Sequence, residues 1–211
     1  MKRDRVSIHV IRRLSRYLRR LDELNLEGAS RISSGELGRQ LGLTASQIRQ
    51  DFSSFGEFGQ QGYGYNINVL RDELRTILGL TRNFSVIIAG VGNLGHALIQ
   101  NFDFKEHGFH LDAAFDVDEK LVGSELCGIK IHHTSDMAEY IKKHGVDIAV
   151  LTVPQTAANE VVRILADSGI KGIWNFTNIE LDNPGNGVFV EDIHFSDSLM
   201  TLSYYLAEDS D

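Results

Sequence analysis

The sequence has little cysteine and no long apolar run. It holds one cysteine, Cys127, among 211 residues. A single cysteine excludes an internal disulfide and a cysteine-cluster metal site, which fits a reducing compartment. The first twenty residues carry many arginines but no unbroken apolar stretch, so they resemble neither a secretory signal nor a membrane span. We therefore expect a cytoplasmic protein with no membrane partner.

The sequence also lacks the overall positive charge that favours DNA binding. The formal net charge is -8, whereas binding to DNA depends largely on neutralising phosphates. The charge is unevenly divided, however. Residues 1–80 hold thirteen Lys and Arg against nine Asp and Glu, and residues 81–211 hold eight against twenty. This asymmetry indicates a basic nucleic-acid-binding module joined to an acidic one.

The basic part begins with the pattern of a helix-turn-helix. Between residues 6 and 21 the apolar residues recur at steps of three and four, and arginines fill the other face of this expected helix. Ser33 and Glu36 have the spacing of a capping box, which predicts the start of a second helix. Gly42 ends that helix.

A third helix is expected to start immediately after the second. Thr44 and Gln47 repeat the capping-box spacing, so residues 41–44 predict a tight turn between two short helices. A fourth helix is expected from about Asn68 to Leu78. Residues 80–83 that follow it form the best domain boundary.

Glycine is frequent between the third and fourth helices. Glycines alternate there with aromatic residues, a pattern that suits a tight β-hairpin better than a helix. The residues of this pattern are Gly56, Phe58, Gly59, Gly62, Tyr63, Gly64 and Tyr65. A hairpin at this point would be the wing of a winged-helix domain.

The acidic part alternates strands with helices. Four short apolar runs without clear alternation predict strands that are buried on both faces. They are Phe84–Ala89, Leu111–Phe115, Asp147–Val153 and Gly172–Asn175. Helical patterns lie between most of them, notably at residues 136–143 and 156–167. This alternation predicts a parallel, doubly wound sheet.

The expected fold class is therefore α/β, with three segments. We expect a winged helix-turn-helix domain at 1–80, a Rossmann domain with a doubly wound parallel sheet at 81–192, and a C-terminal dimerisation helix at 193–211. Within the last segment, residues 195–207 predict an amphipathic helix that carries Leu199, Leu202 and Leu206.

A G-x-G-x-x-G motif directly after the first of these strands predicts a dinucleotide site. Its candidate cofactor contacts are Gly90, Val91, Gly92, Asn93, Leu94 and Gly95. Gly90 permits the tight turn, Gly92 lets the backbone approach a pyrophosphate, and Gly95 lets helix and strand pack closely. The helix N-terminus adds amides and a positive dipole for the phosphates.

Asp116 ends the second strand, where a carboxylate can accept hydrogen bonds from the adenosine ribose. The phosphate of NADP would meet this negative charge, so we expect NADH and NAD+ as the cofactors. A solvated acidic turn is the alternative. Thr152, Val153 and Pro154 close a later strand at the carboxyl edge of the sheet, and they form either a wall beside the nicotinamide or an ordinary strand end.

The third helix carries the candidate DNA contacts. Residues at the N-terminal end of a recognition helix reach base edges, where arginine and glutamine can make bidentate contacts. Arg49 is the first candidate for a base contact, and an ordinary solvated face is the alternative. The other candidates, on this helix and in the wing, are Ser46, Gln47, Gln50, Ser53, Ser54, Gln60, Gln61, Gly62 and Tyr63.

Taken together, these motifs closely resemble the Rex family of redox-sensing repressors. The resemblance is carried by Arg49–Gly59, Gly62–Tyr65, the glycine loop, Phe115–Asp118 and Leu151–Pro154. It implies a homodimer that binds an inverted-repeat operator in double-stranded DNA and releases it when NADH binds. It also implies that the C-terminal helix is exchanged between subunits, with Phe195 near the partner's nicotinamide.

The chain departs from the family's usual residues at three places. The departures lie at Gln50, Ser54, Gln60 and Gln61, at His194, and at Asn101 or Phe102. The first group replaces mostly basic residues, so fewer phosphate contacts are expected. His194 replaces the family's aspartate opposite Arg19, which removes that salt bridge unless Asp192 or Asp197 takes its place. The third departure removes the family's tyrosine from the first Rossmann helix.

The main alternative is a small NAD-dependent oxidoreductase with an accessory DNA-binding domain. Such enzymes need a substrate-binding region and an acid or base beside the nicotinamide. The two modules leave no room for a substrate domain, and the histidines show no metal-ligand spacing. A third possibility is an activator or architectural protein that uses nucleotide only structurally. We expect a repressor without catalytic residues.

Overall fold

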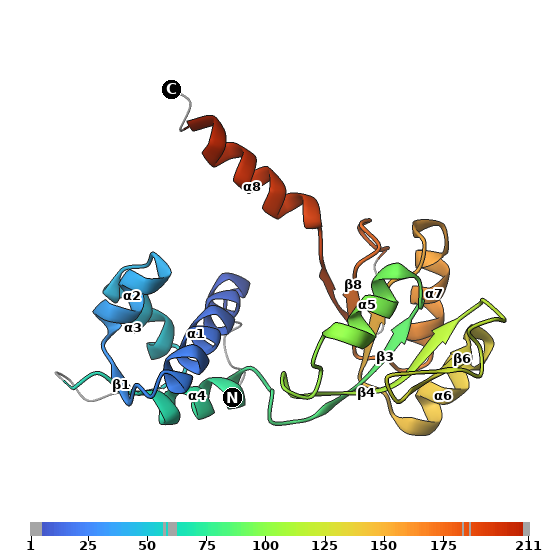
Figure 1. The fold of residues 1–211 in the computed structure, drawn as a ribbon, viewed down its shortest axis with the longest axis horizontal. Helices are drawn as coiled ribbons and strands as arrows, with labels where there is room; N and C mark the ends of the chain where they lie inside the picture. The colour runs from blue at the N-terminus through green and yellow to red at the C-terminus, as the bar shows by residue number, and fades with distance from the viewer. Residues whose placement is uncertain (1–5, 57, 59–62, 183, 186, 209–211) are drawn as a thin grey trace. The chain divides into compact units, whose positions relative to one another are not determined.

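The computed structural model describes residues 6–56, 58, 63–182, 184–185 and 187–208. The chain divides into two compact units, Met1–Arg82 and Asn83–Asp211, each of which is described by itself (Figure 1). No helix in the described part combines the length and the apolar character that crossing a bilayer requires.

In its described residues the first unit contains four helices that share one core, and a small sheet. Its elements are α1 (Ile8–Leu26), β1 (Arg31–Ile32), α2 (Ser34–Leu41), α3 (Ala45–Ser53), β2 (Tyr65–Asn66) and α4 (Ile67–Ile77). The first helix begins at Ile8 because the Ser7 hydroxyl accepts a hydrogen bond from the His9 N–H. It ends five residues later than the sequence pattern suggests, with Leu24 still buried in its last turn.

The predicted helix starts at Ser33 and Thr44 are confirmed. The Ser33 hydroxyl accepts from the Glu36 N–H at 3.0 Å, and the Thr44 hydroxyl accepts from the Gln47 N–H at 3.1 Å. Gly42 ends α2 in the left-handed conformation with φ 68°, as a helix-ending glycine commonly does. The amide nitrogen of the Gln47 side chain donates to Asp51.

The predicted hairpin between α3 and α4 falls largely on residues outside the described part of the chain. Its described end, β2, pairs antiparallel with β1, with Arg31 opposite Asn66 and Ile32 opposite Tyr65. Gly64 precedes this pair with φ 68°, and a Cβ there would lie 2.6 Å from the Ile32 carbonyl oxygen. Only glycine lets the chain enter β2 so close to β1.

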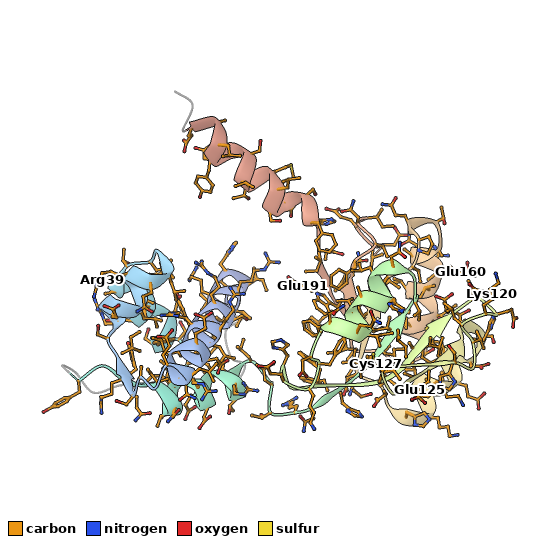
Figure 2. All side chains as sticks on the ribbon, in the orientation of Figure 1. Arg39, Lys120, Glu125, Cys127, Glu160 and Glu191 are labelled. Carbon is orange, nitrogen blue, oxygen red and sulfur yellow. The ribbon has the colours of Figure 1, made fainter. Side chains whose placement is uncertain are left out.

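The second unit contains the strands and helices that the alternating pattern predicts. Its elements are β3 (Phe84–Ala89), α5 (Asn93–Asn101), β4 (Phe109–Asp116), β5 (Glu125–Leu126), β6 (Ile129–His133), η1 (Thr134–Asp136), α6 (Met137–His144), β7 (Ile148–Leu151), α7 (Gln155–Asp167), β8 (Gly172–Asn175), β9 (Phe189–Asp192) and α8 (Phe195–Glu208). The sequence analysis does not predict β5, β6 and β9, which are short and rich in polar residues. Cys127 lies exposed in the turn between β5 and β6 (Figure 2).

The sheet is doubly wound, as predicted. Its described strands lie in the order β5-β6-β4-β3-β7-β8-β9. Every neighbouring pair is parallel except β5 with β6. The chain moves from β3 outward through β4 to β6, and then crosses to the other side of β3 to form β7. The order therefore reverses between β3 and β7, where dinucleotides bind in open α/β sheets.

Both faces of the sheet are covered. Ile87 and Ala89 of β3 belong to the core cluster that includes residues of α6 and α7. Val86 and Ile88 belong to the opposite cluster, which includes Ile99 of α5. This placement on alternate faces confirms the prediction of strands that are buried on both sides.

The last helix, α8, confirms the prediction of a helix over residues 195–207. None of its described residues is buried in the isolated chain. Its large apolar side chains are exposed at Phe195, Leu199, Met200, Leu202, Tyr204, Tyr205 and Leu206. A helix with this much exposed apolar surface is typical of a segment that packs against another chain.

Candidate functional site

The glycine loop after β3 has a backbone that only glycine can follow at two positions. Gly90 has φ +98°, and a Cβ on it would lie 2.9 Å from the Thr152 carbonyl carbon. A Cβ on Gly95 would collide with the Gly90 carbonyl oxygen. These are the contacts expected of a tight turn and of close packing between helix and strand.

The loop lies at the point where the strand order reverses. The Thr152 hydroxyl, just after β7, donates to the Gly90 carbonyl oxygen at 2.7 Å. This bond joins the two loops that border the crevice between β3 and β7. The motif at residues 90–95 and the one at 152–154 therefore lie in contact, although some sixty residues separate them in sequence.

The start of α5 fits a pyrophosphate. Gly92 is the N-cap residue, and no side chain caps this end of the helix. A Cβ on Gly92 would meet no atom within 4 Å. The first amides of a helix have no acceptor within the helix, and together with the helix dipole they favour bound phosphate.

Asp116 lies beside the loop at the end of β4. One carboxylate oxygen accepts from the Val91 N–H at 2.5 Å and the other from the Asp118 N–H at 2.9 Å. A carboxylate offers about four lone pairs, so Asp116 keeps acceptor capacity for ribose hydroxyls. Its bond to Val91 shows that it is more than a solvated turn residue, because it also holds the glycine loop.

The remaining cofactor candidates lie around the same edge of the sheet. Val153 is partly buried and packs against the core cluster on the α6 and α7 face. Pro154 is the N-cap residue of α7. The ring of Phe195, at the start of α8, is exposed and lies 6.1 Å from that of Phe176.

Helix α3 presents a polar face to solvent. Ile48, Asp51 and Phe52 are buried. The exposed side chains are Ser46, Arg49, Gln50, Ser53 and Ser54. The Arg49 guanidinium donates to the Ser34 hydroxyl at the start of α2 at 3.0 Å, so it remains at the surface. A short helix with arginine, glutamine and serine on its outer face suits the major groove of DNA.

Gln47 differs from the other candidates on α3. Its amide nitrogen donates to the buried carboxylate of Asp51 at 2.8 Å, and the residue is partly buried. Among the wing candidates, Gln60, Gln61 and Gly62 lie outside the described residues. Tyr63 is exposed, and its carbonyl oxygen accepts from Arg31 at 3.1 Å.

The sequence analysis does not predict the pairing of Asp51 with Arg13. The two residues come from α3 and α1, and their side chains meet at 2.6 and 2.8 Å. A signal for the burial of Asp51 was present, because it lies next to Phe52 and three residues after Ile48, on the inner face of the helix. Its partner could not be inferred from local spacing.

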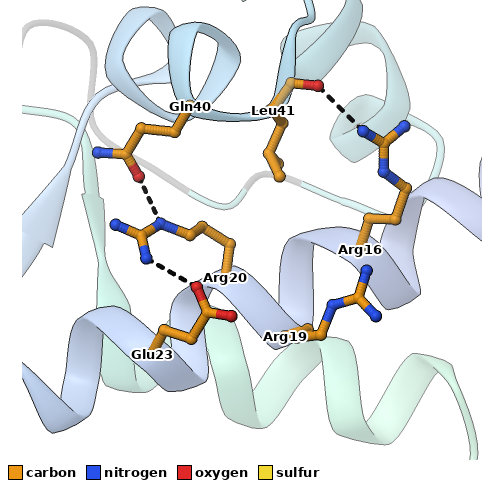
Figure 3. A pocket seen from close by; sticks show the side chains of 6 residues that line it. All are labelled: Arg16, Arg19, Arg20, Glu23, Gln40 and Leu41. Atoms are coloured by element: carbon orange, nitrogen blue, oxygen red, sulfur yellow. Dashed lines mark hydrogen bonds and ion pairs between the residues drawn. The ribbon is translucent and has the colours of Figure 1, made fainter.

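Arginines of α1 also form hydrogen bonds with α2. They line a hollow of about 440 Å³ whose residues are Arg16, Arg19, Arg20, Glu23, Gln40 and Leu41 (Figure 3). Arg16 donates to the Leu41 carbonyl oxygen at 3.0 Å, at the C-terminal end of α2. Arg20 donates to Gln40 at 2.7 Å and to Glu23 at 2.7 Å. A cation at a helix C-terminus interacts favourably with the helix dipole, so these contacts hold α2 firmly against α1.

The departures from the family pattern have local partners in the second unit. His194 contacts the Asn178 side chain at 3.4 Å. Asp192 accepts from Asn175 at 2.7 Å, so its carboxylate is already partly engaged. The Phe102 ring packs on Trp174 at 5.5 Å, and the Asn101 amide donates to the Ala97 carbonyl oxygen.

His132 of β6 is a partly buried histidine. His132 packs its ring between Phe115 and Tyr140, with centroids 5.5 and 5.4 Å away. Burial and the charge of Lys130 lower its pKa, which favours the neutral ring. Within the described part of the chain, no group of three or more His, Cys, Asp or Glu side chains could hold a metal ion.

Comparison with known protein families assigns both units. Residues 81–179 match a family model described as "CoA binding domain", and residues 5–53 match one described as "Putative DNA-binding protein N-terminus". A curated protein of Caldicellulosiruptor bescii, "Redox-sensing transcriptional repressor Rex", is 52% identical over 98% of this chain and 95% of its own.

Solved structures agree with this assignment. The chain is similar to a Rex-family repressor, RSP, in complex with beta-NAD+ and operator DNA, with a TM-score of 0.90 and 44% identity over 97% of this chain and 94% of the other. It is also similar to RSP in complex with beta-NADH, with a TM-score of 0.90 and 41% identity over 98% of this chain and 96% of the other.

Proposed function

Because the chain belongs to the Rex family of redox-sensing transcriptional repressors, we propose that it represses transcription by binding operator DNA as a homodimer and leaves the operator when NADH binds. The observation that carries this proposal is the Thr152–Gly90 bond, which joins the glycine loop to the segment 152–154 in a chain that also carries a helix-turn-helix. The protein would thereby sense the ratio of NADH to NAD+.

The proposed cofactor site comprises the glycine loop, Asp116 and the segment 152–154, together with Phe195, which an exchanged α8 would bring to the nicotinamide in the other subunit. The helix α5 amides bind the pyrophosphate, and Asp116 accepts from the adenosine ribose. A negative charge at Asp116 disfavours the extra phosphate of NADP. The related protein RSP has been solved with both NADH and NAD+, which supports nicotinamide dinucleotides as the ligands here.

The proposed DNA site is the exposed face of α3 with the wing. Arg49 reads a base edge, and Ser46, Gln50, Ser53, Ser54 and Tyr63 contact bases or phosphates. In RSP the operator complex contains NAD+, so the oxidised cofactor is compatible with DNA binding in that relative. NADH can release the operator only by binding more tightly to the arrangement that has low affinity for DNA.

The proposed homodimer uses α8. Leu199, Leu202 and Leu206 are all at least half exposed, at 67%, 53% and 60%. Contact with a second copy would bury this surface, and a two-fold dimer places two recognition helices one DNA turn apart. The three segments proposed from the sequence, 1–80, 81–192 and 193–211, would then act as reader, sensor and dimerisation helix.

We further propose that the protein is not an oxidoreductase. Its relatives carry the name of a transcriptional repressor, which supports a regulator in place of an enzyme. The test combines two assays on wild type. Operator binding that falls with NADH but not with NAD+, together with no oxidation of NADH by 2-oxo acids, supports the repressor. Steady NADH turnover would favour the enzyme.

A further inference from the structure

Helix α3 buries one charged residue, Asp51, whose side chain is 1% exposed. A carboxylate is almost never fully buried unless it is paired, because leaving water costs it several kcal/mol. The residue therefore needs strong partners. It also lies within the helix that carries the proposed DNA contacts, between Gln50 and Phe52.

Asp51 is surrounded by hydrogen-bond donors from two helices. From α1, Arg13 donates to both of its oxygens, at 2.6 and 2.8 Å, and the Tyr17 hydroxyl donates at 2.6 Å. From α3 itself, the Gln47 amide donates at 2.8 Å. These bonds use about all the lone pairs that a carboxylate offers, so the group is satisfied.

The geometry of these bonds sets the direction in which α3 faces. A bidentate arginine fork is planar and directional, so rotating α3 about its axis would break both bonds from Arg13. The Tyr17 ring adds an edge contact to Phe52, with centroids 5.4 Å apart. With Asp51 and Phe52 held inward, Arg49 and Gln50 necessarily face solvent.

The same cluster engages Gln47. Bidentate recognition of adenine needs both the amide nitrogen and the amide oxygen of a glutamine. In Gln47 one amide N–H already donates to Asp51, so turning the whole amide toward a base edge would break this bond. Gln50, one turn further along, carries an exposed side chain.

We infer that Asp51 is the positioning residue of the DNA-reading helix, and that Gln47 acts through Asp51 and is not itself a base-reading residue. This inference rests on the proposed DNA-binding function. Burial tends to raise the pKa of Asp51, but the bonds from Arg13, Tyr17 and Gln47 lower it below its ordinary value. The carboxylate is therefore ionised at neutral pH.

The first test is the replacement Asp51→Asn in the full-length dimer. It keeps the shape but places an NH2 group among donors, so α3 loses its fixed orientation. Operator affinity should fall by about tenfold or more, since hydrogen bonds to charged groups are the strong ones. NADH affinity, which belongs to the other unit, should not change. Tyr17→Phe removes one of the four donors and leaves part of the buried carboxylate without a partner, but both bonds from Arg13 remain, so it should lower operator affinity less.

The second test compares Gln47→Ala with the matched control Gln50→Ala. If Gln47 acts through Asp51, its replacement lowers the unfolding temperature of the first unit and weakens all operator variants equally. In the Asp51→Asn background, Gln47→Ala should cause no further loss of operator affinity or of unfolding temperature. Gln50→Ala should leave the unfolding temperature unchanged, because its side chain is exposed. Base preference is measured on operators substituted at each position.

Two results would overturn the inference. One is loss of discrimination at a single base pair in Gln47→Ala with an unchanged unfolding temperature, which would make Gln47 a base reader. The other is wild-type operator affinity in both Tyr17→Phe and Asp51→Asn, or, where Asp51→Asn does not fold, in Tyr17→Phe and Gln47→Ala. If wild type itself binds no operator, the proposed DNA-binding function fails instead.

Discussion

The Thr152 hydroxyl donates to the Gly90 carbonyl oxygen at 2.7 Å, which ties the end of β7 to the glycine loop after β3. Thr152→Val keeps the shape of the side chain but removes this donor. We expect NADH affinity to fall by about two- to tenfold, the usual worth of one hydrogen bond. Titration calorimetry measures it. Thr76→Val is the control, because the Thr76 hydroxyl makes the same kind of bond to a carbonyl oxygen within α4.

Two results for Thr152→Val and its control Thr76→Val would contradict this prediction, and each has a different meaning. If Thr152→Val and Thr76→Val bind NADH equally well, the bond does not organise the loop. If both bind it weakly, the loss reflects general damage to the protein and not the loss of the link between the two loops.

Alanine substitutions at two glycines of the loop should affect NADH binding and folding stability differently. A Cβ on Gly92 meets no protein atom within 4 Å, so Gly92→Ala should change the free energy of unfolding by at most about 0.5 kcal/mol. It should nevertheless weaken NADH binding, because the added methyl group occupies the approach of the pyrophosphate. Quenching of the single tryptophan, Trp174, measures binding.

Gly95→Ala should behave in the opposite way. Its Cβ would collide with the Gly90 carbonyl oxygen, and forced overpacking costs about 1–3 kcal/mol of folding free energy. Thermal unfolding of both variants tests the pair. A Gly92→Ala variant that binds NADH as wild type does would place the pyrophosphate elsewhere.

Arg49 should determine base preference. We expect Arg49→Ala to cost about 1–3 kcal/mol of operator binding if the contact is bidentate, and to relax preference at one base pair. Arg39→Ala is the control, since Arg39 is exposed on α2 and pairs there with Glu36. Its loss should weaken binding slightly and equally for all operator sequences. An unchanged sequence profile in Arg49→Ala would remove Arg49 from the DNA site.

Removal of α8 should weaken the dimer. A chain that ends at His194 keeps β9, where the Ile193 N–H donates to the Asn175 carbonyl oxygen at 2.8 Å. It loses the apolar surface at Leu199, Leu202 and Leu206, which is exposed in the isolated chain. Sedimentation should show a monomer or a weak dimer. Binding of NADH to this shortened chain should be weak or absent. A full-strength dimer would contradict the role given to α8.

The fold was largely predictable because its signals are local. The strands at Phe84–Ala89 and Gly172–Asn175 have the predicted limits, since short, mostly apolar runs between polar segments leave little choice. The strands β6 and β9 were missed because His132, His133 and Glu191 hide their pattern. Their place in the sheet comes from pairing with β4 and β8, which a single segment does not encode.

The site was predictable only where a motif spans it. The glycine spacing predicts the loop geometry at Gly90 and Gly95, because backbone sterics alone require glycine there. The pairing of Asp51 with Arg13 was not predicted, because it joins residues 38 positions apart through the packing of α1 on α3. Local spacing carries no information about such contacts.

The central claim is that NADH bound beside Asp116 releases the operator. The most direct measurement is the fluorescence anisotropy of labelled operator across an NADH titration, with wild type and Asp116→Ala. Without NADH both proteins should bind operator equally. Asp116→Ala should then need about tenfold or more NADH for release, since it loses charge-assisted bonds to the ribose and its own bond to Val91. Identical release curves would remove Asp116 from the site, and no release of wild type by NADH would contradict the redox-sensing account itself.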